Sequence, residues 1–181
     1  MDTLTFITAN TEKAVQLRRH LDFPVAHKKL DIYEIQSLDL EEIARHKAQE
    51  AYKQVEKPVL VEDTSLIFNA LNLLPGPLIK WFLTSLNNEG LCTLLDSYKD
   101  RSAVAEVCFA LYDGSEVRIF KGEAKGTISK VPKGEQGFGW DPIFIPEGYS
   151  ITWGEMDIEE QKKTSMRRIA LKKLQTYLES L

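Results

Sequence analysis

A short apolar run that ends in two acids constrains this chain more than any other feature of its sequence. Pro58-Val59-Leu60-Val61 contains two β-branched residues and is typical of a buried strand. Its polar end should bring Glu62 and Asp63 to the edge of a sheet, where ligands bind in open α/β folds. Adjacent carboxylates followed by hydroxyls are hard oxygen ligands of the kind that Mg²⁺ prefers. The alternative is that Asp63 and Thr64 only cap the next turn.

A second dense segment, Gly137-Phe138-Gly139-Trp140-Asp141-Pro142, lies between a loop rich in glycine, proline and lysine and an apolar run. Its glycines let the backbone approach a flat ligand closely. Phe138 and Trp140 offer aromatic faces for stacking, and the Asp141 carboxylate can accept hydrogen bonds from the edge of a base. The segment predicts a nucleobase pocket, although a tight turn with buried aromatic side chains would give the same pattern.

The start of the chain predicts an anion site. Residues 3–8 read as a strand, and Asn10 is a good N-cap for the helix that follows. Free backbone N–H groups at such a turn attract anions, and a lysine adds its charge. Thr8, Asn10 and Lys13 are therefore candidates for phosphate binding, with a solvent-facing Lys13 as the alternative.

A helix predicted over residues 40–55 carries a lysine on its apolar face. Its apolar residues recur at spacings of three and four, and Lys47 falls on the same stripe. A lysine in that position must either reach the edge of the helix or pair with an anion, because an unpaired buried ammonium group is costly. Lys80, on the segment 77–86, poses the same choice.

Composition excludes several classes of protein. With 181 residues, of which 43% are hydrophobic, the chain can bury a real core, and we expect a single domain over residues 1–181. The net charge of -4 gives no general attraction to nucleic acid polymers or to anionic membranes. Cys92 and Cys108 lack the spacing of metal ligands, so neither a disulfide framework nor a zinc site is expected. Since we see no signal peptide and no membrane-spanning run, we expect a cytoplasmic protein.

Strand and helix signals alternate along the first part of the chain and then give way to a hairpin. Residues 102–121 read as two strands joined at Asp113-Gly114, and a further strand over residues 122–129 extends the pairing. A final helix is predicted over residues 157–181. Together these elements predict an α/β fold, with a mixed β-sheet and flanking helices.

Taken in order, these motifs resemble the inosine triphosphate pyrophosphatase family. Its members hydrolyse nonstandard purine nucleoside triphosphates, those of inosine, deoxyinosine and xanthosine, to the monophosphate and pyrophosphate, which cleans the nucleotide pool. The resemblance covers nearly the whole chain and runs through Phe6-Ile7-Thr8-Ala9-Asn10 with Lys13, Tyr33-Glu34-Ile35-Gln36, Val59-Leu60-Val61-Glu62-Asp63-Thr64, residues 74–83 and residues 138–142. It implies two lobes around a nucleotide-binding cleft, a homodimer, and Mg²⁺ as the cofactor, with Mn²⁺ as a substitute.

The resemblance also implies roles for individual residues. Asp63 matches the family's metal-binding and general-base aspartate, Glu34 matches its second metal-binding acid, and Glu62 is the next catalytic candidate. Water would attack the α-phosphorus while the divalent ion neutralises the developing charge. The residues matched to triphosphate contacts are Thr8, Asn10, Lys13, Lys47, Thr64 and Lys80. Those matched to nucleoside contacts are Phe138, Gly139, Trp140, Asp141 and Arg167.

Two departures fall on the base-recognising side. Where the family reads Ser-His-Arg, this chain has Ser165-Met166-Arg167, and Gln161 replaces a lysine. Arg167 can still donate to a 6-keto oxygen, whereas methionine cannot repeat the polar contact of a histidine. One lost polar contact changes recognition by about 1–3 kcal/mol, which would weaken purine selectivity without abolishing phosphate chemistry.

These departures leave alternatives open. The first is an active pyrophosphatase, with the family's base preference or a shifted one, and the second is a nucleotide-binding module with little turnover. Retention of Glu34, Asp63 and the candidate lysines favours the enzyme. The related fold that acts on modified pyrimidine nucleotides finds no support in residues 138–142.

Overall fold

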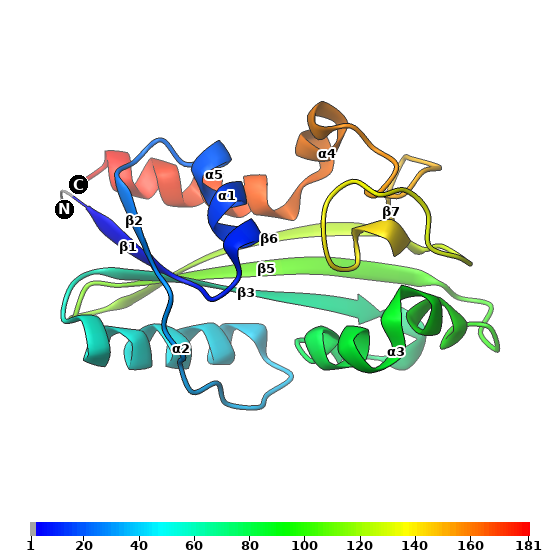
Figure 1. Ribbon diagram of the computed structural model, residues 1–181, viewed down its shortest axis with the longest axis horizontal. Coiled ribbons are helices and arrows are strands. Elements are labelled where there is room, and N and C mark those ends of the chain that lie inside the picture. The colour runs from blue at the N-terminus through cyan, green and yellow to red at the C-terminus, as the bar shows by residue number, and fades with distance from the viewer. Residues whose placement is uncertain (1–2) are drawn as a thin grey trace. The chain divides into compact units, whose positions relative to one another are not determined.

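The computed structural model describes residues 3–181, which contain a mixed β-sheet and helices (Figure 1). The strands of this part of the chain are β1 (Leu4–Ile7), β2 (Val25–Lys28), β3 (Val59–Phe68), β4 (Pro75–Gly76), β5 (Ser102–Tyr112), β6 (Val117–Ile128) and β7 (Phe144–Pro146). They follow the order β2-β1-β3-β5-β6-β7, and β4 pairs with β3. β1 runs parallel to β2 and β3, whereas β7 is antiparallel to β6 and β4 to β3. The predicted α/β fold with a mixed sheet is confirmed.

The chain divides into two compact units. The first comprises residues 3–63, 107–122 and 167–181, and the second comprises residues 64–106 and 123–166. β3, β5 and β6 each contribute residues to both units. The helices of the described residues are α1 (Thr11–His20), α2 (Leu40–Val55), α3 (Ile79–Thr93), α4 (Ile158–Thr164) and α5 (Met166–Glu179), with short 3₁₀ turns at Asn69–Leu71 and Asp141–Ile143. None of these helices is long and apolar enough to cross a bilayer.

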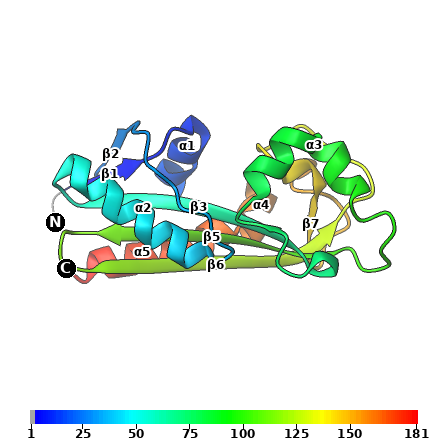
Figure 2. The same ribbon diagram turned by 90° about the horizontal axis from the view of Figure 1, so that it is seen from below.

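Small residues on α2 shape the core of the first unit. Ala44, Ala48 and Ala51 are fully buried and share one apolar cluster with Val59 and Val61 of β3. Figures 1 and 2 show α2 on one face of the strands of this unit and α1 and α5 on the other. The apolar stripe predicted for residues 40–55 is therefore confirmed, and it directs the same side of α2 toward β3.

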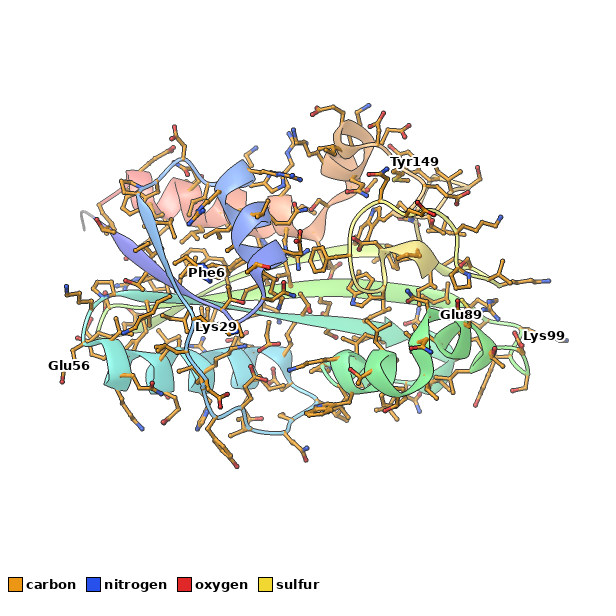
Figure 3. All side chains as sticks on the ribbon, in the orientation of Figure 1. Phe6, Lys29, Glu56, Glu89, Lys99 and Tyr149 are labelled. Carbon is orange, nitrogen blue, oxygen red and sulfur yellow. The ribbon has the colours of Figure 1, made fainter. Side chains whose placement is uncertain are left out.

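The first unit also shows the expected separation of apolar and charged side chains. Phe6, in the middle of β1, is fully buried, whereas Lys29 and Glu56 lie at the surface (Figure 3). Glu56 adopts left-handed backbone angles, φ 52° and ψ 31°, at the end of α2, and its N–H group donates to the Tyr52 carbonyl. This cap ends α2 just before the residues that enter β3.

β3 is longer than the sequence predicted. The predicted strand ends at Val61, but β3 continues through both acids to Phe68. The continuation is favoured because Leu66 and Ile67 pair with β4. β1, in contrast, ends at Ile7, which lies opposite Val61 in the parallel register. The two acids therefore lie beside the carboxyl end of β1 and not at the end of their own strand.

β6 also differs from its prediction. The sequence suggested that one strand ends near residue 121 and that another covers residues 122–129, but a single strand runs from Val117 to Ile128. The glycine at position 122 weakens the local strand signal, and pairing with neighbouring strands overrides that weakness. The hairpin itself is confirmed, because its turn holds Asp113-Gly114 as predicted.

The predicted final helix over residues 157–181 is in fact two helices. Ser165 adopts extended backbone angles, φ -67° and ψ 119°, and separates α4 from α5. Two side chains near the end of α4 bond to Trp153. The indole Nε1 of Trp153 donates to Thr164 Oγ1 over 2.8 Å, and Gln161 Nε2 donates to the Trp153 carbonyl over 2.6 Å. These bonds connect the end of α4 to Trp153 within the second unit.

Candidate active site

Glu62 and Asp63 are adjacent in the sequence, but they take part in different clusters of charge. Consecutive side chains of a strand lie on opposite faces of the sheet. Glu62 contacts Lys13 of α1 and Arg167 of α5. Asp63 contacts Lys47 of α2, which covers the other face of the strands of this unit. The two acids of the sequence motif therefore have different partners and different surroundings.

Lys47 lies between two carboxylates in the first unit. Its Nζ is 3.1 Å from Asp63 Oδ2 and 2.5 Å from Glu34 Oε1, and it also donates to the Glu62 carbonyl over 3.5 Å. Burial alone would lower the pKa of Lys47, but the attraction of Asp63 and Glu34 outweighs it, so that the pKa lies above its ordinary value. The lysine therefore stays charged at neutral pH. The prediction that Lys47 pairs with an anion rather than reaching open solvent is consistent with this geometry.

Glu34 and Asp63 suit a divalent cation. Both carboxylates contact the same ammonium group, so their oxygens converge on one position for positive charge. Mg²⁺ is usually held by one or two carboxylates, with waters and substrate phosphates as its other ligands. Among the residues that the structure describes, no group of three or more His, Cys, Asp or Glu side chains is arranged to hold a metal. Two carboxylates that converge on one position are a donor set that fits Mg²⁺.

Glu62 is the most deeply buried acid of the candidate site. Its side chain is fully buried, and its Oε1 accepts from Arg167 Nε over 3.1 Å and from Arg167 Nη2 over 2.7 Å. Lys13 Nζ lies 3.5 Å from the same oxygen. Burial works to raise the pKa of Glu62, but Arg167 and Lys13 outweigh it and hold the pKa below its ordinary value. Glu62 is thus a buried carboxylate that stays ionised at neutral pH.

The turn after β1 is built as the sequence predicted. Asn10 Oδ1 accepts from the backbone N–H groups of Glu12, over 2.9 Å, and Lys13, over 3.4 Å, which makes Asn10 the N-cap of α1. The Asn10 N–H group in turn donates to Thr8 Oγ1 over 3.1 Å. Thr8 follows Ile7, which lies opposite Val61, so this turn lies next to the two acids of β3. The capped turn fixes the direction from which Lys13 approaches Glu62.

In the second unit, the segment from Gly137 to Asp141 forms a tight turn closed by its own aspartate. Gly137 and Gly139 have φ values of 76° and 67°, and Asp141 Oδ2 accepts from the Phe138 N–H group over 2.8 Å. A Cβ atom on Gly137 would lie 2.0 Å from Asp141 Oδ2. Glycine is therefore required at position 137 both for its conformation and for the space that it leaves.

The aromatic residues of this turn differ in exposure. Trp140 is only 8% exposed and packs against Phe144 and Trp153, with ring centroids 6.0 Å and 5.8 Å away. Phe138 is partly exposed. The alternative of a tight turn with buried aromatics describes Trp140 well, whereas Phe138 is only partly buried.

Asn88 contacts this turn, and the sequence did not identify it as a candidate. It lies on α3, and its Nδ2 donates to the Gly139 carbonyl over 3.0 Å. Its Oδ1 is buried and accepts no hydrogen bond from the described residues. Asparagine is a poor helix former, and α3 has non-helical angles at Asn87. Two consecutive asparagines within a predicted helix are a weak sequence signal, and the bonding partner of Asn88, Gly139, lies 51 residues further along the chain.

The two side chains that depart from the family pattern, Met166 and Gln161, are buried and partly buried. Met166 is 2% exposed at the start of α5, and Gln161 donates its amide to the Trp153 carbonyl. Neither side chain takes the polar role of the family's histidine or lysine, because methionine has no such group and the Gln161 donor has a protein partner. These two positions are thus less polar than in the family pattern that the sequence resembles.

The predicted site residues are shared between the units. The first unit contains Thr8, Asn10, Lys13, Glu34, Lys47, Glu62, Asp63 and Arg167. The second contains Thr64, Lys80, Phe138, Gly139, Trp140 and Asp141. Contacts bring together Glu34, Lys47 and Asp63 in one cluster and Lys13, Glu62 and Arg167 in another. Lys80 is exposed, with its Nζ 5.6 Å from the centre of the Trp81 ring.

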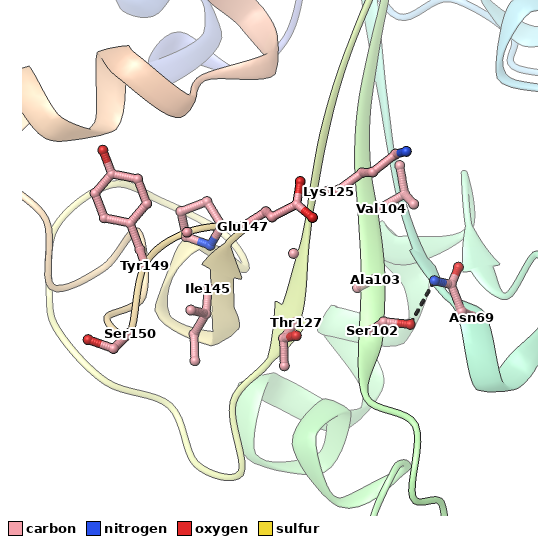
Figure 4. Close-up of a pocket in the computed structure, with 13 residues that line it drawn as sticks. Asn69, Ser102, Ala103, Val104, Lys125, Thr127, Ile145, Glu147, Tyr149 and Ser150 are labelled. Atoms are coloured by element: carbon pink, nitrogen blue, oxygen red, sulfur yellow. Dashed lines mark hydrogen bonds between the residues drawn. The ribbon is translucent and has the colours of Figure 1, made fainter.

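A pocket of the second unit is lined by none of these residues (Figure 4). Its wall comes from β5, β6, β7 and the segment after β7, and it includes Lys125, Glu147 and Tyr149. At one side, Asn69 Nδ2 donates to Ser102 Oγ over 2.8 Å.

Comparison with known proteins places this arrangement in context. Residues 4–177 match the model of the Ham1 family. A Ham1 protein structure from Staphylococcus aureus superposes with a TM-score of 0.86 at 28% identity, with 98% of each chain covered. A HAM1 protein structure from Coxiella burnetii gives 0.88 at 27% identity, with both chains covered in full. A Mycobacterium abscessus structure described as a nucleoside-triphosphatase and dITP/XTP pyrophosphatase gives 0.78 at 28% identity, with 95% of this chain and 98% of that chain covered.

Proposed function

Because the chain belongs to the Ham1 family, we propose that it is a nucleoside triphosphate pyrophosphatase that hydrolyses nonstandard purine nucleoside triphosphates. The products would be the monophosphate and pyrophosphate. The observation that carries the proposal is the convergence of Glu34 and Asp63 on one cationic position, next to a capped turn that holds a lysine. Two carboxylates and several lysines are what a polyphosphate and its counterion require.

Mg²⁺, with Mn²⁺ as a substitute, would be held by Glu34 and Asp63 and would neutralise charge on the phosphate oxygens when bound. Asp63 would orient the attacking water and accept its proton, because of the two neighbouring acids of β3 it is the accessible one, with 18% of its side chain exposed. Glu62 is unsuited to that role, since its side chain is fully buried and held by two cations. The chemistry therefore assigns different tasks to two neighbouring acids.

The positive groups would bind the triphosphate. Lys13 and Lys47 keep 15% and 13% of their side chains exposed, enough to present an ammonium group to a ligand. Asn10 would act mainly through the backbone, because its side chain caps α1 and fixes the N–H groups of the turn. Thr8, Thr64 and Lys80 complete the proposed phosphate contacts. Attack on the α-phosphorus lets pyrophosphate leave with its charge balanced by these groups.

Phe138 would stack on the base, and Arg167 would donate to a 6-keto oxygen. Gly139, Trp140 and Asp141 would shape the nucleoside side of the site. A second candidate, a pyrophosphatase with broader base specificity, is favoured by one observation. Met166 and Gln161 direct no polar group toward a ligand, so fewer contacts distinguish a keto from an amino group. The homodimer and the cytoplasmic location stay predictions.

Product analysis tests the proposal. The protein is incubated with inosine, xanthosine, adenosine, guanosine and pyrimidine triphosphates, with Mg²⁺ or with a chelator, and pyrophosphate and orthophosphate are measured separately. We expect metal-dependent release of pyrophosphate, fastest with inosine or xanthosine triphosphate. Asp63→Asn should lose at least about 10²-fold in kcat, because it removes both a metal ligand and the proton acceptor. Glu123→Gln, an exposed carboxylate change on β6, is the matched control.

The other outcomes are equally informative. Equal rates with all purines would support the broader specificity. Orthophosphate as the first product would contradict the proposed position of attack. Tight nucleotide binding without turnover would leave the chain as a nucleotide-binding module with the family fold.

A further inference from the structure

Three cationic nitrogens meet one oxygen in the first unit. Arg167 Nε and Nη2 and Lys13 Nζ all lie within 3.5 Å of Glu62 Oε1. Lys13 comes from α1, Glu62 from β3 and Arg167 from α5, which is 105 residues away from Glu62 in the sequence. A single carboxylate therefore connects two helices through a strand.

The three side chains differ in their access to solvent. Glu62 has no exposed side-chain surface, whereas Lys13 and Arg167 keep 15% and 13% of theirs. A ligand can reach the lysine and the arginine, but it cannot reach the carboxylate that holds them. Glu62 thus has the position of a group that acts through its neighbours.

Stability alone gives a poor account of this arrangement. A buried ion pair usually stabilises a fold no more than apolar side chains of the same size, because the charges must leave water. Glu62 also leaves its Oε2 buried, with no hydrogen bond from the described residues. The carboxylate instead fixes the orientation of the Lys13 and Arg167 side chains, because it holds the end of each of these long and flexible groups.

We propose that Glu62 is a positioning residue that holds the base-reading Arg167 and the phosphate-binding Lys13 at a fixed separation. This inference rests on the proposed function for the roles of these two cations. It replaces a catalytic role for Glu62 with an effect on recognition. Loss of the carboxylate should release both cations, so that the enzyme reads the base less well while the chemical step at Asp63 continues.

A double-mutant cycle tests the inference. Glu62→Gln keeps the size of the side chain and removes its charge. We expect it to lower the ratio of kcat/KM for inosine over adenosine triphosphate by about tenfold and to raise KM, with kcat for inosine triphosphate within about threefold of wild type. In an Arg167→Met background, Glu62→Gln should leave the ratio unchanged, because the arginine through which it acts is gone.

The phosphate side of the inference has its own readout. Inorganic tripolyphosphate contains no base, and we expect Glu62→Gln to weaken its inhibition of the enzyme by about threefold to tenfold. The same change should add nothing in a Lys13→Met background. Glu62→Asp keeps the charge on a side chain one methylene shorter, and it should give values between those of wild type and Glu62→Gln. If Glu62→Gln does not fold, Glu62→Asp carries the same comparison.

Several results would overturn the inference. One is a loss of kcat in Glu62→Gln as large as that in Asp63→Asn, with base selectivity retained. Another is an effect of Glu62→Gln that is fully additive with Arg167→Met. Glu123→Gln controls for a general effect of removing a carboxylate.

Failure of the proposed function gives a different result. If wild type binds nucleotides without turnover, the ratio of Kd values for inosine and adenosine triphosphate replaces the kinetic ratio, and the cycle still decides the role of Glu62. If wild type neither binds nor hydrolyses any nucleotide, the proposed function and this inference both fail.

Discussion

Lys47 and Asp63 form an ion pair between α2 and β3, with Nζ 3.1 Å from Oδ2. The lysine side chain is 13% exposed, and the same ammonium group contacts Glu34. The presence of Lys47 on the apolar face of α2 is thus explained, because two carboxylates stabilise its charged form. In the proposed function, the same groups would also contact the phosphates and the metal when substrate binds.

Lys47→Met should therefore impair turnover strongly. The change removes a proposed phosphate-binding cation and leaves Glu34 and Asp63 without the positive charge that now lies between them. Removal of one partner from a partly buried charge pair costs about 2–5 kcal/mol, so we expect kcat/KM to fall by about 10²-fold. Pyrophosphate release under steady-state conditions measures the loss.

Lys53→Met is the matched control for that experiment. Lys53 lies on the same helix, but its side chain is 68% exposed and pairs only at the surface with Glu50. Surface pairs contribute little, so kcat/KM should stay within about twofold of wild type. Equal losses in the two variants would contradict a specific role for Lys47.

Gly137→Ala should disrupt the turn of the second unit. A Cβ atom there meets Asp141 Oδ2 at 2.0 Å, and φ is 76°. Gly148 has a similar φ of 83°, but a Cβ atom on it meets nothing within 4 Å. Gly148→Ala therefore measures the conformational cost alone, about 1 kcal/mol. We expect Gly137→Ala to lower Tm further than Gly148→Ala and to raise KM, and equal values of Tm and KM would contradict the steric argument.

Acid should remove the stabilisation that Glu62 supplies. Its pKa is lower in the folded chain than the ordinary value of about 4.3, so its contribution is complete above that pH and is lost as the pH falls through the folded pKa. Urea unfolding of wild type should show a free energy that declines below about pH 4.3. The decline should be shallower in Glu62→Gln, and parallel curves for the two proteins would refute the assignment.

Both cysteines should be inert in the folded protein. Burial raises the pKa of Cys108 to about 12, and burial also raises the pKa of Cys92. A protonated, buried thiol reacts slowly, because the thiolate is the nucleophile. We expect a thiol reagent to label neither residue at pH 8 in native conditions and to label both after unfolding. Rapid labelling of native protein would show that one of these regions opens.

Local patterns gave accurate predictions wherever neighbours in the sequence decide the structure. Asn10 caps α1 because its side chain reaches N–H groups two and three residues ahead. The stripe on α2 is buried because spacings of three and four place those residues on one face. The strand before Glu62 was also predicted, but its continuation to Phe68 was not, since it depends on pairing with β4.

The break between α4 and α5 shows the same limit. The sequence of residues 157–181 has the periodicity of one helix, and the local sign of a break is that Ser165 is a residue type that often caps helices. The hydrogen bonds between Trp153 and two side chains of α4, Thr164 and Gln161, join residues up to 11 positions apart, and the helical periodicity does not reveal them. Asn88 and Gly139 are a still more distant pair, which no local pattern could reveal.

The order of residues along the chain is enough to identify the chemical groups available for a nucleotide: two acids after a buried strand, a capped turn with a lysine, and an arginine near the end of the chain. Which of these groups contact one another follows only from the packing of helices against the sheet. Consecutive side chains of β3 lie on opposite faces of the strand. Asp63 therefore lies in a cluster with Lys47 and Glu34, whereas Glu62 contacts Lys13 and Arg167. The reason is physical: the type of a side chain is local, but its burial and its partners depend on which distant elements pack against each face of the strand.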